Sequence, residues 1–377
     1  MKQFFNVVFL TFIIFSASGQ DTTHIISKEI NLISDLGANV SGGIDRGAAW
    51  LSQVNISLDI PTEKLKLWNN GNLYFHYMST FGKSFSQYSG DLQIVSNIEA
   101  QHIATFMELW YLHEFKWFQI KAGIIDLNAN FVFTDHSLYL LNSSFGIQPT
   151  ISANMPVPIF PVTSLGGIIK FHLTRRMKLS VGLFDGSPSI RSPFQPAPDF
   201  SLRTKEGFLG ITEWNYKYLI KNRKGSMKFG AWIHSTNFDD HHRSLKYSEN
   251  LGTYFITDQE IFRKNDSETY IWMKMGAAPR KCNIVRYFYG GGITVHNPVQ
   301  PVPLDHISFG VAHAVLCNHL DDFEHIGDAN ETAIELSFQK SFGIFSLQPD
   351  LQYIIHPSGR RDVDNSLFLI LRTSIKI

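Results

Sequence analysis

The sequence predicts an all-β protein, an antiparallel transmembrane β-barrel of about 16 strands. Three observations predict it: alternating apolar and polar residues along most of the chain, an N-terminal export signal, and connections that sort into a short and a long set. The alternation is clearest from Glu331 to His356, where two segments on either side of Gly343-Ile344 each have one apolar and one polar face. A soluble sandwich would bury the apolar face, whereas an outer-membrane barrel turns it toward lipid and lines its lumen with the polar face.

The N-terminus favours the membrane alternative. Lys2 precedes an apolar run from Phe4 to Phe15, and small residues follow at 16–19, which is the pattern of a secretory signal peptide. The run is too short for a bilayer core, which needs about 20 apolar residues. We therefore expect residues 1–20 to be a signal peptide and residues 21–377 to form a single barrel in the outer membrane of a Gram-negative bacterium.

Composition narrows the function classes. Lys and Arg number 33 and Asp and Glu also number 33, so no net charge draws the chain to nucleic acid. Aromatic residues make up 14% of the chain, which suits the interfacial girdles of a barrel. The only cysteines, Cys282 and Cys317, are too few for a disulfide scaffold and lack metal-ligand spacing. One bridge between them is an alternative in an oxidising compartment, and we expect neither a cofactor nor a metal.

Strands and turns follow one another along the whole mature chain. We expect strands at 37–44, 48–59, 72–82, 103–115, 117–127, 164–174, 177–186, 206–220, 226–236, 252–264, 268–279, 283–298, 305–316, 331–342, 345–357 and 365–376. Alternate connections are short, as at Lys116 and Gly343-Ile344, while most of the others are long, above all 128–163. Short inner turns and long outer loops are typical of outer-membrane barrels. The connections 45–47, 60–71 and 280–282 depart from this sorting.

Ordered motifs along the chain resemble a known family. They are Leu58–Leu65, Gly90–Gln93, Glu108–Tyr111, Lys121–Gly123, Leu141–Gly146, Gly182–Gly186 and Leu347–Ile354. Together they resemble the OprB family of carbohydrate-selective porins over nearly the whole mature chain. The resemblance implies a sixteen-stranded barrel that passes sugars by diffusion and is narrowed by loops folded inward. The chain departs from many outer-membrane barrels in ending on Ile377 rather than an aromatic residue.

A sugar channel needs polar groups that match hydroxyls, and selectivity arises where such groups face one another at a constriction. Glu108 and Lys121 are the strongest candidates, because a carboxylate and a cation on neighbouring strands would orient a polyhydroxyl solute. Residues 128–163 are too long a connection for a simple exposed loop, so we expect a constriction loop, with a solvent-facing lid as the alternative. The full set of pore-lining candidates is Glu108, Lys121, Asp126, Asn128, Asn142, Ser143, Ser144, Lys170, Glu213, Glu335, Gln348, Asp350 and Gln352. Each could instead be a solvated wall residue far from the constriction.

Two other function classes stay open. A barrel hydrolase would need a nucleophile and a base, but the sequence has no Gly-x-Ser-x-Gly, and His113-Glu114 lacks the second histidine of a zinc motif. A closed barrel could also serve as a scaffold. For the channel we expect sugars or other small polar solutes and outer-membrane lipid as partners, no nucleic acid, and either a monomer or a homotrimer.

Overall fold

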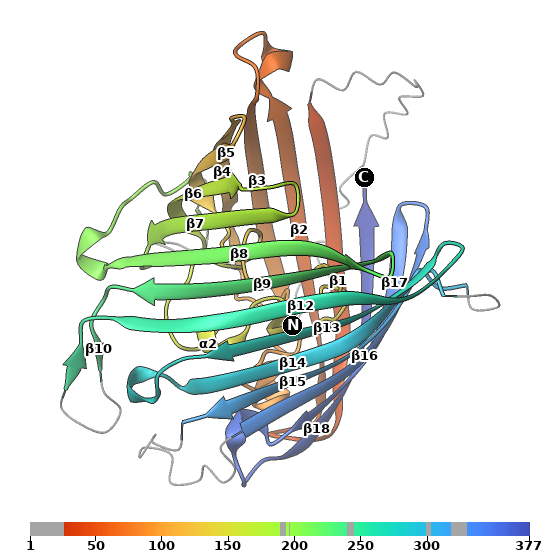
Figure 1. The fold of residues 1–377 in the computed structure, drawn as a ribbon. Helices are drawn as coiled ribbons and strands as arrows, with labels where there is room; N and C mark the ends of the chain where they lie inside the picture. The colour runs from red at the N-terminus through yellow and green to blue at the C-terminus, as the bar shows by residue number, and fades with distance from the viewer. Residues whose placement is uncertain (1–25, 189–193, 196, 240–244, 299–302, 318–329) are drawn as a thin grey trace, which may run out of the picture.

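The computed structural model describes residues 26–188, 194–195, 197–239, 245–298, 303–317 and 330–377. In these residues sixteen strands close into one antiparallel barrel, in which the first strand, β1, pairs with the last, β18 (Figure 1). The barrel strands are β1 (Ser27–Gly43), β2 (Gly47–Pro61), β3 (Gly71–Gly82), β4 (Ile103–Glu114), β5 (Phe118–Ile125), β6 (Ser164–His172), β7 (Met177–Asp185), β8 (Phe208–Ile220), β9 (Arg223–His234), β12 (Asn250–Lys264), β13 (Ser267–Ala277), β14 (Val285–His296), β15 (His306–Leu316), β16 (Asn330–Phe342), β17 (Phe345–Ile355) and β18 (Asp364–Lys376). Two short strands, β10 (Phe238–Asp239) and β11 (Lys246–Tyr247), form a separate hairpin.

The register of β16 and β17 decides which face turns inward. Glu335 pairs with Gln352, and both side chains are fully buried, whereas Leu351 on the other face is 39% exposed. The polar set therefore faces the lumen and the apolar set faces outward, as the barrel interpretation predicts and a sandwich does not. The predicted fold class and strand number are confirmed.

The first strand is longer than the sequence suggested. We expected it to begin at residue 37, but β1 begins at Ser27 and pairs with β2 from that residue onward. Ile30 and Leu32 are exposed on its outer face, while Asp35 is buried on the lumen side. The alternation of apolar and polar residues thus extends ten residues further toward the N-terminus, where the two faces of β1 differ less in polarity. Residues 1–20, the expected signal peptide, lie outside the described residues.

Connections at the two ends of the barrel differ in length. At the end that holds the start of β1 and the end of β18, strands are joined by short segments such as 115–117, 221–222 and 343–344. The opposite end has the longest ones, 83–102, 126–163 and 186–207. The sorting by length is therefore present in the structure. No helix in the described part of the chain is both long enough and apolar enough to cross a membrane.

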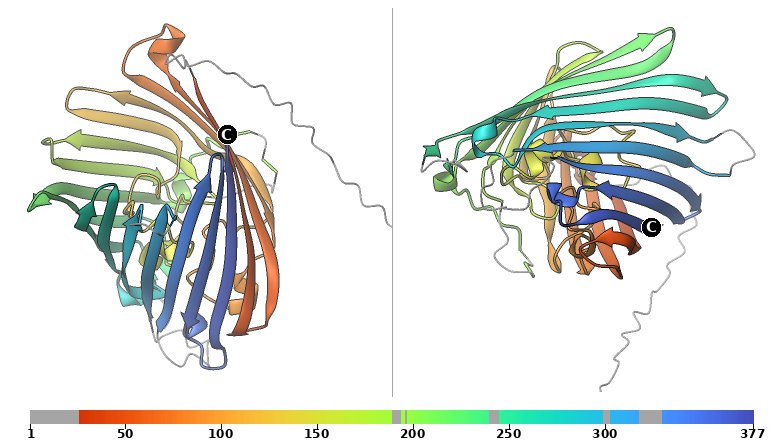
Figure 2. Two further views of the ribbon diagram at one scale, coloured as in Figure 1. Left: turned by 90° about the vertical axis from the view of Figure 1, so that its right-hand side faces the viewer. Right: turned by 90° about the horizontal axis from the view of Figure 1, so that it is seen from below.

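Two of these long connections, loop 83–102 and loop 126–163, lie inside the barrel (Figure 2, in orange to yellow). The first contains α1 (Ser86–Ser89), and the second contains a 3-10 turn (Ser143–Phe145) and α2 (Pro149–Ser152). Apolar side chains of loop 126–163 form a buried cluster with inward-facing side chains of the wall, among them Trp232 on β9 and Tyr254 on β12. A large part of the lumen is thus filled by packed side chains.

Candidate functional site

Loop 126–163 is tied to the barrel wall through β16 and β17. The carboxylate of Glu335 accepts hydrogen bonds from the backbone N–H groups of Leu141 and Asn142, the second at 2.9 Å. The amide of Gln352 accepts from Asn142 Nδ2 at 3.4 Å and donates to the carbonyl of Val95 in loop 83–102 at 2.8 Å. In a water-filled lumen these side chains would bind water. Here they bind backbone and side-chain groups of the two loops instead.

Further anchors surround this one. Lys274 Nζ on β13 is fully buried and donates to the carbonyls of Phe145, at 3.0 Å, and Gly146. Gln348 Nε2 donates to the carbonyl of Tyr139 at 2.8 Å. The wall leaves room for the loop because its lumen face carries small residues here, and a Cβ on Gly310 would overlap side-chain atoms of Leu140 and Phe145. Loop 126–163 is therefore fitted to this wall by both shape and hydrogen bonding.

Loop 83–102 has its own anchors on β16 and β18. The carboxylate of Glu331 accepts from the backbone N–H groups of Leu92 at 2.7 Å and Gln93 at 2.9 Å. Arg372 makes a bidentate ion pair with Asp35 on β1, at 2.7 and 2.8 Å, and also donates to Asn97 Oδ1 at 2.8 Å. Buried charges of this kind need partners, and these partners fix the loop against the wall.

Glu108 and Lys121 lie near each other on β4 and β5, where loop 126–163 begins; Glu108 is 8% exposed and Lys121 is half-buried. Trp110 Nε1 donates to Glu108 Oε1 at 3.0 Å, and Lys121 Nζ lies 4.0 Å from the centre of the Trp110 ring. Lys121 Nζ also donates to Asn130 Oδ1 in loop 126–163 at 3.0 Å. The structure thus brings the predicted carboxylate and cation together at the point where the loop leaves the wall.

Asp126 adds a second carboxyl group at this point. Its backbone N–H lies 3.4 Å from Glu108 Oε1, and its own Oδ1 accepts from the N–H of Asn128 at 2.8 Å. Burial and the nearby charge of Glu108 raise the pKa of Asp126 to about 7. Near neutral pH this carboxyl group is therefore only partly ionised.

Aromatic rings line the same site. Tyr74 on β3 stacks on Trp110 with ring centroids 4.8 Å apart and planes 23° apart. Neither ring is fully buried, so both keep some contact with solvent. Tyr74 and Asn130 were not among the residues selected from the sequence. The pairing of Tyr74 with Trp110 on adjacent strands follows from the alternation, which could have identified Tyr74.

The remaining candidates within loop 126–163 serve its own fold. Asn128 Nδ2 donates to the carbonyl of Phe131 at 3.2 Å. Asn142 is fully buried, and its Oδ1 caps the following 3-10 turn by accepting from Ser144 N at 3.1 Å. Ser144 is buried as well, while Ser143 is half-buried and its N–H donates to the carbonyl of Ile94 at 3.0 Å.

The other candidates on the wall differ from one another in what they contact. Glu213 on β8 accepts from Val132 N at 3.1 Å and from the Tyr254 hydroxyl at 3.0 Å, so it anchors the loop. Asp350 is buried beside Glu335 and accepts from Gln352 Nε2 at 3.1 Å. Lys170 on β6 is half-exposed to the lumen.

The two cysteines are not joined in the structure. Cys282 and Cys317 are buried thiols that flank β14 and β15, and the disulfide considered from the sequence is not formed. Within the described residues, no group of three or more His, Cys, Asp or Glu side chains is arranged to hold a metal ion.

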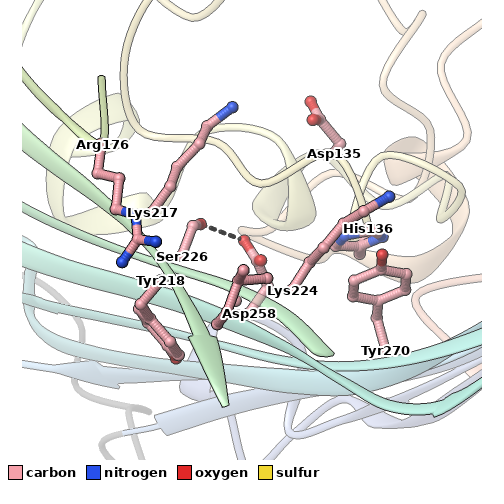
Figure 3. Close-up of a pocket in the computed structure, with 11 residues that line it drawn as sticks. Asp135, His136, Arg176, Lys217, Tyr218, Lys224, Ser226, Asp258 and Tyr270 are labelled. Atoms are coloured by element: carbon pink, nitrogen blue, oxygen red, sulfur yellow. Dashed lines mark hydrogen bonds between the residues drawn. The ribbon is translucent and has the colours of Figure 1, made fainter. Parts of the chain in front are cut away.

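A cavity of about 380 Å³ opens on the far side of loop 126–163, toward the end with short turns (Figure 3). Asp135 and His136 of the loop face wall residues of β8, β9, β12 and β13 across it. Asp258 on β12 accepts from Ser226 Oγ at 2.7 Å and from Thr134 Oγ1 of the loop at 3.1 Å. The ring of His136 stacks on Tyr270 at 3.7 Å, and burial lowers the pKa of His136.

Comparison with known proteins identifies the family. The family model described as "Carbohydrate-selective porin, OprB family" matches residues 45–377. The chain belongs to the OprB family. It is therefore a carbohydrate-selective outer-membrane porin, a transport channel and not an enzyme. The expectations of an outer-membrane location and of a sugar channel are confirmed.

Solved structures show the same fold. The high-pH structure of OprB from Pseudomonas putida has a TM-score of 0.83 and 17% identity, over 93% of this chain and 94% of that chain. The low-pH structure of the same protein has a TM-score of 0.60 and 13% identity, over 93% and 92%. The outer-membrane channel DcaP of Acinetobacter baumannii has a TM-score of 0.56 and 7% identity, over 93% and 97%. A comparison with curated proteins gives no match.

Proposed function

We propose that carbohydrate crosses this porin between loop 126–163 and the wall of β2 to β6, past a constriction made by Tyr74, Glu108, Trp110, Lys121 and Asn130. The observation that carries this proposal is the contact of Lys121 with both Asn130 and the Trp110 ring. It joins the wall to the loop at a place where the side chains of Trp110, Lys121 and Asn130 are only half-buried, beside the buried carboxylate of Glu108.

The chemistry of these groups suits a pyranose. Glu108 accepts hydrogen bonds, Lys121 donates them, and Asn130 can do both, so sugar hydroxyls find partners on two sides. The parts of the Tyr74 and Trp110 rings that stay exposed add apolar surface for the C–H groups of the sugar. A carboxylate near a cation also keeps the constriction itself close to neutral, so it orients a polyhydroxyl solute without favouring ions of either sign.

The other predicted pore residues take different roles in this proposal. Lys170 lines the path beside the constriction. Glu213, Glu335, Gln348, Asp350 and Gln352 act indirectly, because they hold loop 126–163 in place. Asp126, Asn128, Asn142, Ser143 and Ser144 shape the loop itself. The path lies within one barrel, so transport needs no partner subunit, and both a monomer and a homotrimer would provide it.

We also propose that residues 1–20 are removed on export, leaving 21–377 as the mature porin. N-terminal sequencing of the protein from outer membranes tests this. A mature chain that still begins at Met1 would contradict it.

Sugar block of single-channel current tests the constriction. Lys121→Ala removes a charged donor worth about 1.5 to 3 kcal/mol, so the glucose concentration for half block should rise about tenfold or more. Ion conductance should rise at the same time, because the constriction widens. Lys340→Ala serves as the control, since Lys340 pairs with Asp305 at 2.8 Å and lies on the outward-facing set of β16. Unchanged glucose block in Lys121→Ala would remove Lys121 from the path.

A further inference from the structure

A row of lysines crosses the lumen face of five adjoining strands. It starts at the proposed constriction and approaches the end with short turns. Its members are Lys121 on β5, Lys170 on β6, Lys178 on β7, Lys217 on β8 and Lys224 on β9. We call this set the lysine row.

Strand register places these side chains inside the barrel. Glu213 on β8 faces the lumen, because it binds the backbone of loop 126–163. Glu213 pairs with Ser180, and Asn215 pairs with both Lys178 and Lys228. Since side chains alternate along a strand, Lys178 and Lys217 share the lumen face with Glu213. Lys228 also binds the loop, at the carbonyl of Phe133, so Lys224, four residues away on β9, faces inward too.

Apart from Lys121, which has Glu108 nearby at the constriction, the lysine row lacks the carboxylate partners that other inward charges have. Arg372 pairs with Asp35 at 2.7 Å, Lys228 with Glu213 at 3.8 Å and Lys376 with Glu29 at 2.9 Å. Within the described residues, no carboxylate oxygen lies within 4.0 Å of an ammonium group of the lysine row. Members of the row instead lie near other cations: Lys170 is under the charges of Lys178 and Lys228 as well as Glu213.

The cavity on the far side of loop 126–163 continues this arrangement. Arg176, Lys217 and Lys224 line it, together with the carboxyl groups of Asp135 and Asp258 (Figure 3). Asp258 is occupied by the hydroxyls of Ser226 and Thr134. The cavity is thus lined by three cations and two carboxylates, of which Asp135 is exposed to solvent and Asp258 is hydrogen-bonded. Its volume is large enough for a small molecule.

We propose that the lysine row guides anionic carbohydrates, namely monosaccharides that carry one carboxylate or phosphate group, from the constriction to the inner mouth. The proposal rests on the path described under Proposed function and adds a class of substrate to it. Unpaired cations along a low-dielectric wall concentrate anions. Their spacing over five strands gives a series of weak sites, and a solute can leave weak sites as readily as it enters them.

Ion selectivity tests the row. Lys178→Gln/Lys217→Gln/Lys224→Gln removes three charges and keeps side-chain size. The zero-current potential across a planar bilayer, under a gradient of potassium glucuronate or of potassium glucose 6-phosphate, gives the permeability of each anion relative to potassium. We expect that ratio to exceed one in the wild type and to fall about tenfold in the triple variant, given a fraction of a kcal/mol per exposed charge.

Two controls separate the outcomes. Lys28→Gln/Lys340→Gln removes charges from the opposite faces of β1 and β16 and should leave the ratio unchanged. Liposome swelling with neutral glucose should be the same for the wild type and the triple variant. The proposed role of the lysine row would be overturned if the wild type favoured potassium over both anions. It would also be overturned if the triple variant had the same anion-to-potassium permeability ratio as the wild type. Failure of glucose to enter liposomes with the wild-type channel would instead overturn the proposed path.

Discussion

Two walls of this barrel have the same alternating sequence pattern, but their inward polar side chains differ in how far they are buried. On the anchoring wall, β13 to β18, inward polar residues such as Glu335, Lys274 and Gln352 are fully buried and bind loop backbone. On the open wall, β4 to β9, inward residues such as Lys121 and Lys178 keep contact with solvent, although Glu213 and Trp232 of the same wall are buried against loop 126–163. Both walls alternate apolar and polar residues with a period of two.

The difference shows that the alternation of residues predicts which way a side chain points but not whether it contacts water. An inward polar side chain lines water only where no other segment covers it. On the anchoring wall the cover comes from loops 83–102 and 126–163, whose backbone N–H and C=O groups need partners once they leave water. The polar residues of β16 and β17 supply those partners.

The largest expected effect comes from breaking the anchoring wall at Glu335. Glu335→Ala leaves the N–H groups of Leu141 and Asn142 unsatisfied, at a cost of about 1 to 3 kcal/mol each. Loop 126–163 should then leave the lumen for part of the time. We expect single-channel conductance to rise several-fold, and we expect raffinose, a trisaccharide that the wild-type channel should exclude, to enter liposomes.

A matched control uses Glu206, which is exposed in the connection between β7 and β8. Glu206→Ala removes the same charge and should leave conductance and size exclusion unchanged. If Glu335→Ala folds into a barrel and still excludes raffinose, Glu335 does not hold the loop.

The strand order and the direction of each side chain could be predicted from the sequence, because both follow from local alternation and the lengths of connections. The placement of Glu108 and Lys121 at one site beside Trp110 was predictable for the same reason, since they lie on paired strands. The burial of Glu335 and Gln352 was not, because it depends on residues about 190 to 260 positions away along the chain, among them Leu141 and Val95. One signal was present: Gly310, Ala312 and Ala333 make the anchoring wall flat, and a flat inner wall is where a loop can pack.

A smaller effect is expected at Lys274. Lys274→Met keeps the buried aliphatic stem but removes the donors to the carbonyls of Phe145 and Gly146. A net loss of about 1 to 2 kcal/mol is expected, because lost hydrogen bonds to carbonyls are partly offset by relief of a buried charge. Urea unfolding of the barrel in lipid vesicles measures it as a lower midpoint. Lys264→Met, at the exposed end of β12, should leave the midpoint unchanged, and an equal shift in both variants would show that the Lys274 contacts are not responsible.

An effect no larger than that at Lys274 should appear at Asp126, directly after β5 on the open wall, and it should depend on pH. Burial and the Glu108 charge raise the pKa of this carboxyl group from 3.8 to about 7, so the folded barrel keeps a proton that the unfolded chain releases. Stability from this group is therefore greatest below pH 4 and declines as pH rises through 7.

Asp126→Asn keeps the acceptor for Asn128 N and cannot ionise, so it should stabilise the barrel relative to wild type at pH 8. The gain should be on the order of 1 to 2 kcal/mol, because the carboxyl is not fully shielded from water. Urea unfolding in vesicles at pH 4 and pH 8 measures it, with Asp362→Asn, on the exposed connection before β18, as the control. A gain of equal size at both pH values would mean that Asp126 ionises normally in the folded barrel.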